Sequence, residues 1–138
     1  MENATEIIHD TVAVVVEQDG KFLVARKAKG FLAAGEFGFP AGHVDEGEDI
    51  LTAMKREAKE ETNGVEVVGD KPFLVFVHDA PKSRTGPHQH KCHVFRGKVV
   101  GDLIPDDDAD ELTWFTKEEI LSNPKVQEWA KTIIKEKY

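Results

Sequence analysis

The sequence predicts an α/β fold in which a mixed β-sheet is covered by helices on both of its faces. Three observations favour it. Short runs of β-branched and aromatic residues are bounded by Gly, Pro and Asp, as strands commonly are. One helical stretch, residues 49–62, lies between these runs, and a second helical segment, residues 116–138, closes the chain. At 138 residues the chain is most economically one domain, 1–138, with a core that needs no disulfide.

The first expected elements are a hairpin and a short extended segment. Residues 11–27 consist of two β-branched runs joined by Asp-Gly at 19–20, a strong hairpin signal. Phe37 and Phe39 then alternate in a Gly-rich stretch, which predicts a short extended segment that passes into an irregular loop. Pro40 disfavours a helix until after that loop.

The second half of the chain predicts more strands and a divided helix. Four further apolar runs indicate strands at 65–68, 72–78, 91–100 and 111–115. Thr116 and Glu119 have the spacing of a capping box, so a helix should begin there. Asn-Pro at 123–124 should break that helix in two.

Composition and charge narrow the function. The 18 basic and 26 acidic side chains give a net charge of -8 and form no basic stripe, which disfavours a nucleic-acid partner, whereas free nucleotides held through a cation remain compatible. The lone Cys92 fits a reducing compartment. No basic n-region begins the chain, and the first apolar stretch, from Val12, is too short to span a bilayer. We therefore expect a cytoplasmic protein without a membrane partner, and a homodimer is compatible with these features.

The helix at 49–62 carries acids where a helix disfavours them. Glu57, Glu60 and Glu61 lie in its last turn, against the macrodipole, and Glu57 and Glu61 form a repulsive i,i+4 pair. On a helical wheel Glu57 and Glu61 border the apolar stripe and Glu60 flanks them; the stripe consists of Ile50, Leu51, Met54 and Ala58. Half-buried carboxylates need a neutralising cation, and an all-oxygen set suits Mg²⁺ or Mn²⁺.

Two neighbouring features complete a predicted metal site. Arg56 lies next to Glu57 and one turn before Glu60, where a forked hydrogen bond can orient a carboxylate. The preceding loop, FPAGHVDEGE, brings the Gly42 carbonyl and Glu48 to the N-terminal side of the helix.

Residues 42–64 resemble the Nudix box, Gly-x5-Glu-x7-Arg-Glu-apolar-x-Glu-Glu-x-Gly-apolar. The matching residues are Gly42, Glu48, Arg56, Glu57, Ala58, Glu60 and Glu61. The chain departs from the pattern at Asn63-Gly64, so either Asn63 adopts a left-handed cap conformation or the helix ends one residue later. The resemblance implies a Nudix-type α/β/α sandwich, with the box helix and a C-terminal helix on a mixed sheet.

The resemblance also implies a reaction. Nudix (MutT-like) hydrolases use a divalent metal, Mg²⁺ or Mn²⁺, to cleave the pyrophosphate bond of a nucleoside diphosphate derivative and release a mononucleotide. The resemblance implies catalytic roles for Arg56, Glu57, Glu60 and Glu61, and metal ligation by Gly42, Glu57, Glu60 and Glu61. Asp110 and Glu111 are candidates for a general base outside the box, and the candidate substrate-binding residues are Arg26, Phe37, Asp110 and Glu111.

The small-molecule substrate stays open between a nucleoside triphosphate, including oxidised ones, and ADP-ribose, for which Pro81 is a hint. The alternative function is a catalytically silent nucleotide sensor; loss of a box carboxylate would favour it, and none is lost.

Other polar clusters have simpler interpretations. The acidic run at 105–111 lacks the spacing of a calcium loop and is interpreted as a solvated loop. The cluster at 88–93 matches no closed zinc pattern, which favours a substrate cleft lined by His78, His88 or His90. Trp114, Phe115 and Trp129 are expected to pack in the core, and packing is favoured over base stacking for Phe37.

Overall fold

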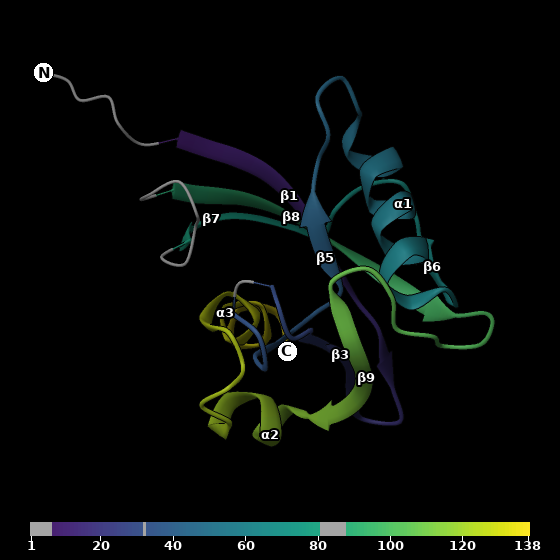
Figure 1. Ribbon diagram of the computed structural model, residues 1–138, viewed down its shortest axis with the longest axis vertical. Helices are drawn as coiled ribbons and strands as arrows, with labels where there is room; N and C mark the ends of the chain where they lie inside the picture. Colours follow the sequence, from purple (N-terminus) through teal and green to yellow (C-terminus); the bar gives the residue numbers. More distant parts are fainter. Residues whose placement is uncertain (1–6, 32, 81–87) are drawn as a thin grey trace, which may run out of the picture.

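The computed structural model describes residues 7–31, 33–80 and 88–138, and its strands form two sheets (Figure 1). The first is a mixed five-stranded sheet, because β1 and β8 run parallel while its other pairs are antiparallel; its strands are β5 (Ala41–His43), β1 (Ile7–Val15), β8 (His88–Val99), β6 (Val65–Val68) and β7 (Leu74–Ala80). The second is an antiparallel four-stranded sheet made of β2 (Glu17–Gln18), β3 (Lys21–Lys27), β4 (Phe37–Gly38) and β9 (Ala109–Thr116).

The predicted hairpin is present, but its first arm is short. Asp19 and Gly20 both have positive φ, 54° and 77°, and connect β2 to β3. Both edges of β1 are already occupied, by β5 and β8, so β3 pairs with β9 instead. This is why the strands divide into two sheets.

The box helix α1 (Ile50–Thr62) covers one face of the first sheet, as its apolar stripe predicted. Asp49 caps its N-terminus by accepting a 2.8 Å hydrogen bond from the Thr52 backbone N–H. The helix packs on alternate residues of the β1 region in a core that contains Val12, Val14, Val16, Leu23, Ala53, Met54, Ala58, Val65 and Phe95.

The opposite face is covered by α2 (Lys117–Ser122) and α3 (Glu128–Lys137). The capping box of Thr116 and Glu119 is present, and the helix is divided after Ser122, as predicted. The second core contains Ala13 and Val15 from the other face of β1, together with Phe22, Val24, Phe39, Ile120, Ala130, Ile133 and Ile134. Helices therefore lie on both sides of the strands, and the α/β/α sandwich is confirmed (Figure 1).

The exit of α1 resolves the departure at Asn63-Gly64. The helix ends at Thr62 and not one residue later, and Asn63 caps it with φ 64° and ψ -44°. Its φ is positive, as the first alternative requires, but its ψ is not that of the left-handed helical conformation. The Asn63 side chain donates a 2.9 Å hydrogen bond to the Asp102 carbonyl. A Cβ added to Gly64 would lie 2.5 Å from the Gly101 carbonyl oxygen, so this position needs glycine for close backbone approach.

The four strands expected in the second half of the chain are all present, as β6 to β9. The loop expected after Pro40 differs, because Ala41–His43 pairs with β1 as the edge strand β5. Trp114, Phe115 and Trp129 pack against the two cores, as expected. No helix among the described residues is long and apolar enough to cross a membrane. Pro81 lies outside the described residues.

Replacing Gly64 tests the close approach at the helix exit. Gly64→Ala should destabilise the fold by about 2–4 kcal/mol, because the new methyl group meets backbone carbonyls that cannot move independently. Urea unfolding would measure this difference. Gly101→Ala is the matched control, since a Cβ there has only one neighbour, at 3.9 Å. Equal effects of the two substitutions would contradict the assignment.

Candidate active site

The last turn of α1 places two box acids in the interior. Glu57 is 7% exposed and Glu61 2%, whereas the Glu60 side chain is 45% exposed. This is the order that the helical wheel predicted, with two acids beside the apolar stripe and the third outside it. Burial of two carboxylates on one helix face needs compensation by cations or protons.

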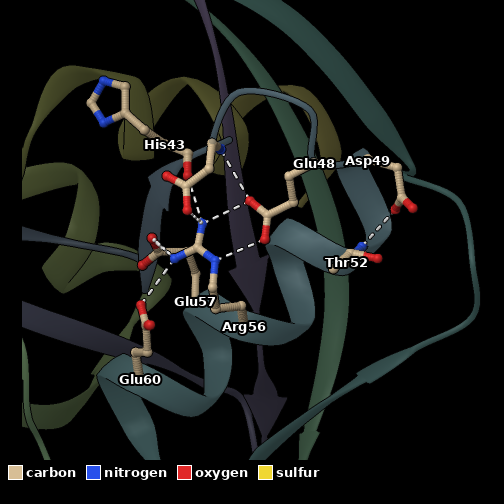
Figure 2. A network of polar contacts seen from close by, with 8 residues as sticks. His43, Glu48, Asp49, Thr52, Arg56, Glu57 and Glu60 are labelled. Atoms are coloured by element: carbon tan, nitrogen blue, oxygen red, sulfur yellow. Dashed lines mark hydrogen bonds and ion pairs between the residues drawn. The ribbon is translucent and has the colours of Figure 1, made fainter.

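Arg56 is the centre of a polar network that joins the box loop to the helix (Figure 2). Its guanidinium forks onto Glu48, with Nε donating to Oε2 at 2.8 Å and Nη2 to Oε1 at 2.9 Å. Nη1 donates to Glu57 Oε2 at 2.9 Å and to Glu60 Oε1 at 3.0 Å. Nη2 also donates to the His43 carbonyl at 3.0 Å. The forked bond expected from the sequence is present, and its partner is Glu48.

The pKa values of Glu48 and Glu57 are shifted in opposite directions. The Arg56 hydrogen bonds lower the pKa of Glu48 to about 2, which keeps that carboxylate ionised. Burial raises the pKa of Glu57 to about 7, although the Arg56 guanidinium opposes the rise. A buried acid held near neutrality is typical of functional sites.

Strand β5 brings backbone groups against the helix acids. A Cβ added to Gly42 would lie 2.0 Å from the Glu57 carboxyl carbon, so only glycine fits here. The neighbouring Ala41 N–H donates a 3.3 Å hydrogen bond to Glu61 Oε1. Glycine at position 42 therefore lets the edge strand lie directly against the carboxyl groups of Glu57 and Glu61.

Asp107 and Asp108, from the loop before β9, join the box acids. Carboxylate oxygens of Glu57, Glu60 and Asp107 lie within 4.8 Å of one another, as do those of Glu61, Asp107 and Asp108. The interpretation of residues 105–111 as a solvated loop was therefore wrong for Asp108, whose Oδ1 is buried. The loop turns toward the helix at Asp107, which has a positive φ of 60°.

Glu61 and Asp108 leave buried oxygens unsatisfied. Glu61 Oε2 and Asp108 Oδ1 have no hydrogen-bond donor within the described residues. Burial, and then the neighbouring Asp108, raise the pKa of Glu61 to about 9, whereas contacts with Glu61 and Lys27 outweigh burial and lower the pKa of Asp108. Because the two acids belong to one carboxylate group, their buried oxygens need a shared proton or a cation. The all-oxygen donor set fits Mg²⁺ or Mn²⁺.

A pocket of about 200 Å³ adjoins this cluster. Glu61, Asp108, Lys27 and Gly42 line one part of it, and the remainder is lined largely by rings and small groups, including His43, His78, His90, Phe39, Trp129 and Gln127. Of the three histidines expected to line a substrate cleft, His78 and His90 line this pocket and His88 does not. Burial lowers the pKa of His78 and that of His90, the latter to about 4, so these imidazoles are neutral at pH 7. Within the described residues, only carboxylate groups qualify as three-ligand metal clusters.

Three of the four residues predicted to bind substrate outside the box line a neighbouring pocket, and the fourth, Glu111, pairs with Arg26. Arg26 Nε donates to Asp110 at 2.8 Å and its Nη1 pairs with Glu111 at 3.0 Å. Phe37 packs on Phe115 at 5.0 Å between ring centroids, which confirms the packing interpretation. Arg26, Phe37 and Asp110 line a second pocket of about 350 Å³. Asp110 and Glu111 thus contact Arg26, while Asp107 and Asp108 contact the box acids.

Sequence reasoning missed Asp107, Asp108 and Lys27. The acidic run was visible, but nothing in its spacing shows which carboxylate points inward, because loop residues have no periodicity. Only the pairing of β9 with β3 brings this loop against the end of α1.

The fold and site are those of a Nudix-type hydrolase. The chain belongs to the NUDIX domain family, whose model matches residues 8–137. It is 31% identical over 117 residues to a CTP pyrophosphohydrolase from Escherichia coli K12, a match that covers 83% of this chain and 81% of that protein. Nudix hydrolases generally use divalent metal ions, in agreement with the two carboxylate groups.

Two further similarities agree with this family. The chain is 33% identical over 111 residues to an ADP-ribose pyrophosphatase from Methanocaldococcus jannaschii, covering 78% of this chain but only 63% of that protein. The fold matches the crystal structure of a MutT protein from Methanosarcina mazei Go1 with a TM-score of 0.77 at 21% identity, over 97% of this chain and 95% of that one.

Glu61→Gln should stabilise the metal-free protein at alkaline pH. Because the folded chain raises the pKa of Glu61 from 4.5 to about 9, its contribution is fully present below the unfolded value and is lost as pH rises toward about 9. In chelator near pH 9 the variant should exceed the parent by about 2 kcal/mol, with a smaller gain near pH 5. Urea unfolding at both pH values measures this.

Glu60→Gln is the control for that experiment. Its side chain is 45% exposed, so the substitution should change stability by less than about 0.5 kcal/mol. A parent whose stability exceeds that of Glu61→Gln near pH 9 would show that Glu61 is not a strained acid.

Proposed function

We propose that the protein is a divalent-metal-dependent hydrolase of the pyrophosphate bond in a nucleoside diphosphate derivative, and that it releases a mononucleotide. The observation that carries this proposal is the pair of buried, unsatisfied oxygens of Glu61 and Asp108 beside a pocket. Glu61 and Asp108 would hold a divalent cation beside this pocket, and the cation would supply the positive charge that both buried oxygens lack. The pyrophosphohydrolase relatives support the same reaction class.

We assign the cation to a combined set of residues. Glu57, Glu60, Glu61 and the Gly42 carbonyl come from the box, and Asp107 and Asp108 are added from the loop before β9. Bound there, Mg²⁺ or Mn²⁺ supplies charge neutralisation and a more acidic water. Arg56 fixes the orientation of Glu48, Glu57 and Glu60 through its five hydrogen bonds to them and to His43. Its role is to keep the acids aligned while charge changes around them.

We propose that one of these box or loop acids is the general base that accepts a proton from the attacking water. Asp110 and Glu111, the candidates from sequence, are paired with Arg26, and this ion pair reduces their basicity and their freedom to move. We therefore give these two residues a role in positioning Arg26 for substrate binding. Arg26 and Lys27 line both pockets, whereas Lys29 and Lys125 line only the second one. We therefore assign phosphate binding to Arg26 and Lys27.

The ring-lined pocket is the proposed base site. Its volume of about 200 Å³ suits one nucleobase, and Phe39, Trp129 and His78 offer apolar ring surfaces. Gln127 offers a side-chain amide that can bond a base edge. The relatives act on CTP and ADP-ribose, as their names state, and both types of molecule are candidate substrates for this chain. A homodimer, the absence of nucleic-acid binding and a cytoplasmic location stay predictions.

Mononucleotide release tests the function. The panel comprises ADP-ribose, nucleoside and deoxynucleoside triphosphates, and sugar nucleotides, each with Mg²⁺ or Mn²⁺ and with chelator. We expect chelator-sensitive cleavage of at least one member, reduced about a hundredfold or more in Glu61→Gln. If a panel member binds and raises the melting temperature but none is cleaved, the nucleotide sensor replaces the enzyme.

A second comparison separates the two pairs of loop acids. Asp108→Asn should weaken Mn²⁺ binding by about tenfold, because it removes a charged ligand. Asp110→Asn should leave Mn²⁺ affinity within about twofold, since its carboxylate binds Arg26 and any residual effect is screened. Calorimetric titration of the substrate-free chain with Mn²⁺ measures both constants. If Asp110→Asn weakened Mn²⁺ binding more than Asp108→Asn, the metal site would have to be assigned to the acids beside Arg26.

A further inference from the structure

Lys27 is the cation that already occupies the carboxylate cluster. Its Nζ donates a 2.8 Å hydrogen bond to Asp108 Oδ2, and both side chains are 28% exposed. A register shift between Arg26 and Lys27 interrupts the pairing of β3 with β9. Such a bulge changes the direction of a side chain, and here Lys27 reaches the cluster while Arg26 binds Asp110 and Glu111.

The charge of Lys27 is kept by several acids together. Burial alone would lower the pKa of its ammonium group, but Glu61, Asp108 and Glu57 outweigh burial and raise it. The ammonium group therefore remains positively charged at neutral pH. Its effect on a neighbouring ion depends on where the ammonium lies and not on its protonation.

Lys27 and a divalent cation compete for the same acid. Asp108 belongs to the three-carboxylate group with Glu61 and Asp107, yet one of its oxygens binds Lys27 while the other is buried and unsatisfied. A cation within this group would lie close to the ammonium, and like charges at such short range repel each other. Binding of a cation in this group is therefore unfavourable while the Lys27 ammonium stays on Asp108.

We propose that Lys27 is an exchangeable counter-ion, which holds Asp108 in the metal-free protein and releases it when a cation enters the Glu61–Asp107–Asp108 group. The released ammonium then binds a phosphate of the substrate. This inference rests on the proposed function. The position of Lys27 supports the second step, because its side chain lines both pockets and links the carboxylate cluster to the groove that holds Arg26.

The exchange has opposite consequences for the two ligands. Without substrate, Lys27 opposes entry of the cation into the Glu61–Asp107–Asp108 group. With substrate, the ammonium gains a phosphate partner, so cation and substrate should favour each other's binding. Removal of the Lys27 charge should therefore strengthen binding of the cation and weaken binding of the substrate.

The first test is Mn²⁺ binding to the substrate-free full chain, measured by calorimetry. Lys27→Met should bind Mn²⁺ about three- to tenfold more tightly than the parent, because a competing positive charge is removed. Lys29→Met is the control: it loses the same charge two residues away, and Lys29 is exposed with no ion pair in the described part of the chain. Unchanged or weaker Mn²⁺ binding by folded Lys27→Met would overturn the proposal, as would equal tightening in both variants.

A double-mutant cycle tests whether Lys27 acts through Asp108. In the Asp108→Asn background, Lys27→Met should no longer tighten Mn²⁺ binding by more than about twofold, since the shared carboxylate is gone. Persistence of the full effect would mean that Lys27 acts only through the general field, and would overturn the exchange. Circular dichroism melting in chelator confirms that each variant is folded before titration.

Steady-state kinetics completes the test on the best substrate of the panel. Lys27→Met should raise KM about tenfold while lowering the Mn²⁺ concentration that gives half-maximal activity. A general distortion of the site would weaken the binding of both Mn²⁺ and substrate. A rise in both KM and the Mn²⁺ concentration for half-maximal activity would therefore overturn the proposal. Because the calorimetry needs no substrate, the inference can fail while the hydrolase activity stands, and the absence of any hydrolysis would leave a measured Mn²⁺ effect in place.

Discussion

The Arg56 guanidinium is the contact on which the arrangement of the site depends. It joins three segments: the loop acid Glu48, the backbone of strand β5 at His43, and the helix acids Glu57 and Glu60. A lysine could not replace it, because only a planar fork can bind Glu48 through two nitrogens and keep further donors for the helix acids. Gly42 is the complementary constraint, since any side chain there would displace Glu57. Together they hold the carboxyl groups side by side before any ligand binds.

This arrangement costs stability, and the two cores offset it. Glu61 is buried with Asp108 beside it, and two neighbouring carboxylates that share neither a proton nor a cation are unfavourable. The alternate faces of β1 pack into separate hydrophobic cores, one under α1 and one under α3, so the strand that supports the site is covered on both sides. The strain is thus local to the end of α1, at the place where a ligand can relieve it.

Local sequence signals predicted the elements and the box acids, and failed where partners come from distant segments. The capping box at Thr116, the hairpin turn at 19–20 and the wheel position of Glu61 depend only on neighbours in the chain, so their spacing was sufficient. The division into two sheets follows from β1 already having two neighbours, which no local pattern records. Asp108 and Lys27 are 81 residues apart in the chain, and their contact depends on the register of β3 and β9 and its bulge. Sequence therefore located the helix acids and missed the loop acids that face them.

The charge distribution explains how an acidic protein can bind a polyanion. The chain carries a net charge of -8, and its ring-lined pocket offers imidazoles that burial keeps neutral at His78 and His90. The basic side chains that line both pockets are Arg26 and Lys27, and each is already paired with an acid. Attraction for a nucleotide must then come from cations bound to the carboxylates and from ammonium or guanidinium groups freed by them. Binding of metal and binding of substrate are coupled in such a site, because neither the acids nor their basic partners can serve both states at once.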